Sequence, residues 1–90
     1  MSEQWSTSLN PEIRRDGKTY RARVLGFERA ANTWEGRIEF RDGSGHAITT
    51  GHETSQPDRK ALEYWATGLE PVFLEGALQR ALNVEKKAKT

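Results

Sequence analysis

The stretch WEGRIEFR, residues 34–41, decides the fold class, because its apolar and charged residues alternate strictly. Trp34, Ile38 and Phe40 fall on one side and charged side chains on the other. This period of two is typical of a β-strand with one face in a core and one face in water. Such a strand requires neighbouring strands and a layer that covers its apolar face, so the flanking sequence should supply both.

The segment before this strand carries a hairpin signal. Asp-Gly at 16–17 stands between IRR and KTYRARV, and both positions of a tight two-residue hairpin loop require positive φ angles, which this dipeptide tolerates. A loop of this length sets Arg15 opposite Lys18 and Ile13 opposite Tyr20. Ile13 then shares a face with the apolar residues that follow Tyr20, so the turn and the apolar pattern agree.

Leu25 and Phe27 depart from this pattern, because alternation from Tyr20 places both on the charged face. A β-bulge at Gly26 would return Phe27 to the core. Without that bulge, the two side chains form an apolar spot suited to self-association or to a partner. We prefer the bulge.

The DGSG sequence after residue 41 predicts a turn into another strand. A three-residue loop over 42–44 would set Ile38 opposite Ile48 and keep both in the core. A two-residue loop would place Ile48 on the charged face, so we expect the three-residue register. The next long strand then covers about residues 46–53.

After residue 56 the apolar period changes from two to about 3.6, which indicates helix. The first stripe ends at Gly68, a natural helix stop, and Pro71 is a natural restart at a first helical turn. The apolar positions of the two stripes are Leu62, Trp65, Ala66 and Leu69, then Leu74, Ala77, Leu78, Ala81 and Leu82. We expect either one helix kinked near Pro71 or two short helices.

These patterns predict a single α+β domain of 90 residues. A small antiparallel sheet of three to four strands in meander order occupies about residues 12–54. The helical region covers about residues 56–83 and lies on one face of the sheet. Residues 1–11 read as a loose leader and residues 84–90 as a frayed basic tail.

The composition excludes several classes of function. The chain has no cysteine, so disulfides, thiolate metal sites and thiol nucleophiles are excluded, and a reduced cytoplasmic location is expected. A net charge of +1 is too balanced to indicate a polyanion partner by itself. No secretory leader and no run of about 20 apolar residues is apparent, so we expect no membrane association.

The polar run TGHETSQPDR, residues 50–59, allows two interpretations. Ser55 with Asp58 three residues later approximates a capping box at a helix start, and this is the interpretation we prefer. The alternative is a binding loop, with Trp34 opposite His52 at the end of the sheet. That loop would draw on Thr50, His52, Glu53 and Thr54, and a pocket there would lie near Trp34.

Metal and cofactor binding are not expected. His46 and His52 share a strand face but would lie roughly 20 Å apart at about 3.3 Å per residue, which is beyond the reach of one ion. The glycines at 43 and 45 lie in a hairpin, which is not the strand-to-helix context that cradles phosphate. We find no catalytic hydroxyl, histidine and carboxylate set outside the crowded loop at residues 50–58, so the sequence leans against an enzyme.

The charged face of the predicted sheet is rich in arginine. Arginine forms planar forks to phosphate, so RNA or DNA could bind there, but cross-strand pairs with Glu35 and Glu39 would also stabilise an exposed sheet without a ligand. The four arginines of this surface are Arg21, Arg23, Arg37 and Arg41. We favour the salt-bridged sheet.

Three functional hypotheses follow. The leading one is a small binding domain for a protein partner or for a second copy, in which Tyr64 and Phe73 beside the helical stripe supply aromatic contacts. The alternative is an RNA- or DNA-binding module that uses the four arginines. The second alternative is an enzyme or ligand-binding subunit with a polar pocket near His52. The order of elements resembles double-stranded RNA-binding domains, but the N-terminal helix and lysine-rich helix start of that family have no counterpart, so no residue role follows.

Overall fold

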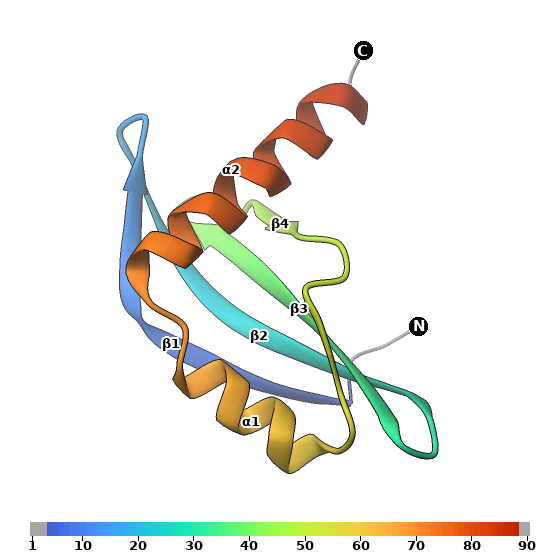
Figure 1. Cartoon of the computed structure of the whole chain (residues 1–90). Helices are drawn as coiled ribbons and strands as arrows, with labels where there is room; N and C mark the ends of the chain where they lie inside the picture. Colours follow the sequence, from blue (N-terminus) through green and yellow to red (C-terminus); the bar gives the residue numbers. More distant parts are fainter. Residues whose placement is uncertain (1–3, 89–90) are drawn as a thin grey trace.

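The structure, a computed structural model, describes residues 4–88 and shows strands followed by helices. The elements are β1 (Trp5–Arg15), β2 (Lys18–Ala30), β3 (Thr33–Asp42), β4 (Ala47–Thr49), β5 (Thr54–Gln56), α1 (Arg59–Thr67) and α2 (Pro71–Ala88). The strands form one antiparallel sheet in the order β1-β2-β3-β4, and β5 also pairs with β3 (Figure 1). The predicted α+β class with a meander sheet is therefore confirmed, with two separate helices in place of one kinked rod.

The first hairpin has the predicted register. Arg15 pairs with Lys18 and Ile13 with Tyr20. The turn residues Asp16 and Gly17 have φ angles of 53° and 78°. Positive φ at both positions is what a two-residue hairpin loop of this kind demands.

Strand β1 begins earlier than the sequence pattern indicated. Residues 5–11 belong to the sheet and not to a loose leader, while residues 1–3 lie outside the described part of the chain. The pairing of β1 with β2 shifts by two residues between Ser8 and Glu12. This bulge interrupts the alternation of β1, so the segment carries no clean period-two signal.

The turn between β3 and β4 corrects the predicted register. Phe40, not Ile38, lies opposite Ile48. The Asp42 N–H donates to the His46 carbonyl at 3.0 Å, so the three-residue loop covers 43–45 and not 42–44. The displacement changes the pairing by two residues, which preserves face parity, and Ile48 is buried as predicted.

Asp42 fixes this loop from within. Its carboxylate accepts from the Ser44 hydroxyl at 2.7 Å and from the backbone N–H groups of Ser44 and His46 at 2.9 and 3.2 Å. The Ser44 hydroxyl is the main reason that the pKa of Asp42 lies below its ordinary value. A carboxylate that organises a turn in this way selects one loop position over its neighbours.

The expected long strand over residues 46–53 is two short strands. β4 stops after three residues, and β5 resumes the pairing with β3 after two extra residues. Together with the two-residue change of register at the β3–β4 turn, this places Gln56 and not His52 opposite Trp34. At the break, the Thr50 hydroxyl accepts from the Ile38 N–H at 3.0 Å. The side chain of Thr50 therefore supplies a hydrogen bond that the ladder would otherwise provide.

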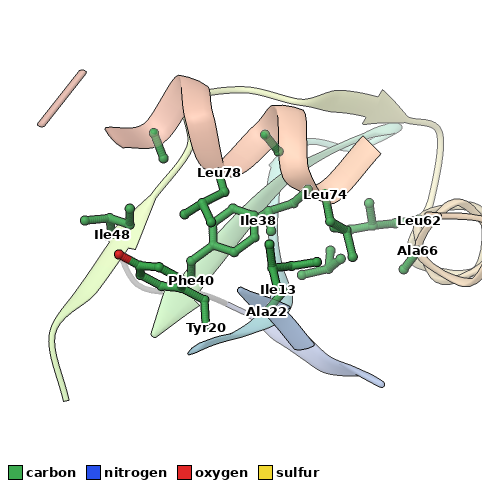
Figure 2. Close-up of a cluster of buried hydrophobic side chains, with 13 residues drawn as sticks. Ile13, Tyr20, Ala22, Ile38, Phe40, Ile48, Leu62, Ala66, Leu74 and Leu78 are labelled. Atoms are coloured by element: carbon green, nitrogen blue, oxygen red, sulfur yellow. The ribbon is translucent and has the colours of Figure 1, made fainter. Parts of the chain in front are cut away.

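Helices α1 and α2 cover the apolar face of the sheet (Figure 1, Figure 2). The core consists of Ile13, Tyr20, Ala22, Val24, Ile38, Phe40, Ile48, Leu62, Ala66, Leu74, Ala77, Leu78 and Ala81. Where α1 crosses the sheet, the cross-strand partners Gly26 and Gly36 lie beneath Leu62, which is fully buried. A Cβ atom added to Gly26 or Gly36 would lie 2.9 or 2.8 Å from a methyl carbon of Leu62.

The helix termini follow partly from the sequence. Helix α1 ends at Gly68, and α2 begins at Pro71, as predicted. Helix α2 continues to Ala88, beyond the predicted end of the helical region at about residue 83. Neither helix within residues 4–88 combines the length and the apolar composition needed to cross a membrane.

The start of α1 differs from the capping box that we predicted. Asp58 is the N-cap, and its carboxylate accepts from the Ala61 N–H at 2.8 Å. Ser55 lies in β5 opposite Glu35, and its hydroxyl contacts His52. The capping role of Ser55 was therefore wrong, because strand pairing holds residue 55 three positions before the N-cap.

We expect Asp58→Ala to lower the free energy of unfolding by about 0.5–2 kcal/mol, the usual cost of losing an N-cap side chain. Ser55→Ala is the matched control and should change stability by less than about 0.5 kcal/mol, as exposed substitutions away from caps do. Urea denaturation of the two variants measures the difference. A larger loss for Ser55→Ala than for Asp58→Ala would contradict this assignment of the cap.

Candidate functional site

The face of the sheet that points away from the helices carries the arginines, and we call it the arginine face. Alternation along β2 continues without interruption past Gly26, with Leu25 opposite Arg37 and Phe27 opposite Glu35. The predicted bulge at Gly26 was therefore wrong, and the register shift lies between residues 28 and 30. Leu25 and Phe27 remain on the arginine face, yet only 7% and 8% of their surfaces are exposed.

Two arginines cover Phe27. The guanidinium carbons of Arg29 and Arg37 each lie 5.7 Å from the centre of its ring. Both guanidinium groups donate to the carboxylate of Glu35, whose side chain is 7% exposed. Two of the protein's own charged side chains thus cover Phe27 by cation–π contact while they ion-pair with Glu35.

Glu35 is ionised in this arrangement. Burial raises the pKa of its carboxyl, but hydrogen bonds from Arg29 and Arg37 and their positive charges outweigh burial. The pKa of Glu35 therefore lies below its ordinary value of 4.5. The sequence analysis did not identify Arg29. Its position two residues after Phe27 places both side chains on the same face of β2, and this parity was the signal that could have identified it.

The other predicted arginines also have carboxylate partners. Arg23 Nε lies 2.8 Å from Glu39 Oε1, and an Arg41 nitrogen lies 3.6 Å from the same oxygen. An Arg21 nitrogen lies 3.2 Å from Glu12 Oε2. The hydrogen bond from Arg23 is the main reason that the pKa of Glu39 is lowered.

The structure brings three of the four predicted arginines together and leaves one apart. A hollow of about 550 Å³ lies at the bulge of β1, and Arg21, Arg23 and Arg41 line it together with Glu12 and Glu39. Arg37 lies instead beside Phe27, as described above. The arginine face is therefore two clusters and not one continuous basic surface.

The residues of the predicted polar pocket point in different directions. Thr50 is buried and bonds the backbone of β3, whereas Trp34 is half-buried against the core. The carboxylate of Glu53 accepts from Arg80 of α2 at 2.6 Å. His52 is exposed and approaches the arginine face, with Nδ1 3.8 Å from a Glu35 oxygen. These four side chains do not converge on one point.

A groove between α1 and α2 gathers exposed apolar side chains. Three large side chains at this groove are exposed: Tyr64 at 81%, Val72 at 72% and Phe73 at 38%. The groove measures about 560 Å³, and Trp65 and Leu69 also line it. Trp65 and Phe73 contact edge to face with ring centres 6.4 Å apart.

Within residues 4–88 no three histidine, aspartate or glutamate side chains gather in a way that could hold a metal ion. Comparison of the chain with protein-family models, with curated proteins and with solved structures finds no match.

Proposed function

We propose that the protein is a binding domain that self-associates through the groove between α1 and α2, which we call the helical groove. One observation carries this proposal. Of the four large hydrophobic side chains that are exposed in the described residues, three border this groove, and the fourth is Val84. Apolar surface concentrated in this way is typical of an interaction site.

A second copy suits the helical groove because the same chain carries both a hollow and a projecting aromatic side chain at its rim. In a two-fold dimer one patch meets its own copy, so Tyr64 of each protomer can enter the groove of the other. Trp65, Leu69 and Phe73 offer an apolar lining for that ring. Tyrosine is well suited as an anchor, since it buries a large ring at the cost of ordering only two side-chain torsions.

The charges around the helical groove permit this contact. Helix α1 carries Arg59 and Lys60 on exposed positions and Glu63 on a partly exposed one, and Glu70 lines the groove. Arg59 and Glu63 already form an ion pair at 3.3 Å. Because both signs are present and the net charge is only +1, two copies repel each other weakly.

The arginine face supports a protein partner or nucleic acid less well as the main binding surface. Each of its predicted arginines ion-pairs with a carboxylate, and Leu25 and Phe27 are covered. A partner bound across the whole face would compete with these existing ion pairs. The helical groove, by contrast, leaves apolar surface in water, and burial of that surface is favourable by about 25 cal/mol per Å².

Self-association is tested by solution mass over a range of protein concentrations. We expect the mass to rise from 10.2 kDa toward twice that value as concentration increases. Tyr64→Ser should shift the transition to about tenfold or more higher concentration, because it removes a central aromatic anchor. Val84→Ser is the matched control, since it removes an exposed apolar side chain outside the groove, and it should leave the transition unchanged.

Two outcomes would count against the proposal. A mass of 10.2 kDa at all concentrations would show that a second copy does not fill the groove. Equal weakening by Tyr64→Ser and Val84→Ser would show association through general hydrophobicity and not through this groove.

A further inference from the structure

Two like charges face each other on the arginine face. Arg21 of β2 and Arg41 of β3 are direct cross-strand partners. Two residues further along the same strands, Arg23 lies opposite Glu39, which is the complementary arrangement that a charged sheet surface favours. Like charges directly opposite each other destabilise a sheet, so an anion that contacts both Arg21 and Arg41 would be favoured at this pair.

Two hollows meet at this pair. The larger, of about 550 Å³, has Ser8 and Asn10 in its wall, and the smaller, of about 220 Å³, has Thr19. Arg21 and Arg41 line both hollows. The larger hollow lies where the bulge between Ser8 and Glu12 interrupts the pairing of β1 with β2. The two guanidinium groups therefore border open space on both sides.

The carboxylates nearby do not use up the binding capacity of this pair. Arg21 contacts Glu12 at 3.2 Å, while Arg41 lies 3.6 Å from Glu39, which Arg23 also holds, and donates to the Gly45 carbonyl at 3.1 Å. A guanidinium carries five N–H donors, and one carboxylate engages at most two of them in a fork. The side chains of Arg21 and Arg41 are 82% and 51% exposed, so the remaining donors can reach a ligand.

We propose that the Arg21–Arg41 pair binds a phosphate group, carried either by a small phosphorylated molecule or by a nucleic acid strand. A phosphate monoester has three terminal oxygens and up to two negative charges, and a phosphodiester of a nucleic acid has two free oxygens and one charge. Either can bridge two guanidinium groups, which converts their repulsion into two charge-assisted contacts. The Ser8 hydroxyl and the Asn10 amide in the wall add neutral donors. This site lies on the face of the sheet opposite the helices and is independent of the helical groove.

Two substitutions should change the affinity for phosphate in opposite directions, and the first is at Glu12. Its carboxylate competes with phosphate for Arg21, so Glu12→Gln should bind phosphate several-fold more tightly than the wild type. Arg21→Gln should lose about tenfold or more in affinity, as expected for removal of one charge-assisted contact. Arg59→Gln, on α1, makes the same change in net charge away from the site and is the matched control, with unchanged affinity.

The measurement is a titration of the full chain with inorganic phosphate and with pyrophosphate, at constant ionic strength, followed by backbone amide shifts in NMR spectra. We expect saturable shifts along β2 and β3 near residues 21 and 41.

The melting temperature without added anion separates binding from a structural role. Arg21→Gln should melt no lower than the wild type, because it relieves a like-charged pair. A purely structural role for Arg21 would lower the melting temperature of this variant. Tyr64→Ser should bind phosphate as the wild type does, which separates this site from self-association.

A short single-stranded oligonucleotide distinguishes the two sources of phosphate. Binding that weakens steeply with salt and is displaced by pyrophosphate would assign a nucleic acid strand. Saturable binding of pyrophosphate without binding of the oligonucleotide would assign a small phosphorylated ligand. If no probe gives saturable shifts at these strands, or if Arg21→Gln and Arg59→Gln bind alike, the proposal is overturned.

Discussion

Replacing Gly36 by alanine should lower the free energy of unfolding by about 1–3 kcal/mol, the usual cost of overpacking a close-packed interior. The added methyl carbon would lie 2.8 Å from Leu62 Cδ1 and 2.8 Å from Thr54 Cγ2. Both neighbours would have to move. Leu62 is fully buried, so its side chain cannot shift into solvent. Urea denaturation, with the slope compared between variants, measures the loss.

A double-mutant cycle makes this prediction specific. Leu62→Ala alone should cost about 2–5 kcal/mol, because it leaves a cavity in the core. In the double variant the methyl group added at position 36 occupies part of the space that Leu62 vacated, so the combined loss should be smaller than the sum of the two single losses. Additive losses would show that Gly36 and Leu62 are not in the close contact described here.

Gly43→Ala is the matched control for the glycine substitution. Nothing lies within 4 Å of a Cβ atom built at this turn residue, and its φ angle is not in the positive range. We expect a change within about 0.5 kcal/mol, as for other surface substitutions. A loss equal to that of Gly36→Ala would indicate that removal of glycine itself, and not contact with α1, is responsible.

The second large effect is expected at Glu35. Glu35→Gln should lower the free energy of unfolding at neutral pH by about 1–3 kcal/mol, because two partly buried guanidinium groups, those of Arg29 and Arg37, lose their shared carboxylate. The cost stays below that of a fully buried pair because both arginine side chains are about one third exposed, at 34% and 35%, and water can solvate them.

The pH dependence of stability follows from the lowered pKa of Glu35. A carboxyl whose pKa is lower in the folded than in the unfolded state contributes stability that is fully present above the unfolded-state pKa. That contribution is lost as pH falls from about the ordinary value of 4.5 through the lower folded value. The wild type should therefore lose stability in this acid range, and Glu35→Gln should lose less.

Melting temperatures measured from neutral to acid pH check this prediction, and Glu63→Gln serves as the control. Glu63 pairs with Arg59 on the exposed surface of α1, with side chains 45% and 60% exposed, so its removal should change stability by less than about 1 kcal/mol at any pH. If Glu35→Gln followed the wild-type pH curve, Glu35 would not contribute to acid sensitivity. Glu39, whose pKa is also lowered, is expected to supply part of the remaining dependence.

The helical groove and the arginine face were only partly predictable. Tyr64 and Phe73 could be identified as surplus aromatics, because a helix period leaves them beside the buried stripe. The four arginines could be assigned to one face, because strand parity is strict. That Arg21, Arg23 and Arg41 share a hollow while Arg37 covers Phe27 could not be predicted, because it depends on the bulge of β1 and on the pairing of side chains across strands.

The sequence by itself determined which faces are buried and where the main turns lie. Alternation along residues 34–41, the Asp-Gly turn at 16–17 and the helix signals at Gly68 and Pro71 are local features, and the described structure follows each of them. Tertiary structure decided the register of β3 with β4, the break at Thr50 and the burial of Phe27. The physical reason for the register is that a two-residue change preserves the apolar face, so hydrophobicity cannot select between the alternatives, whereas the hydrogen bonds of Asp42 and Thr50 can. The burial of Phe27 depends on arginine side chains that only the folded sheet places over its ring.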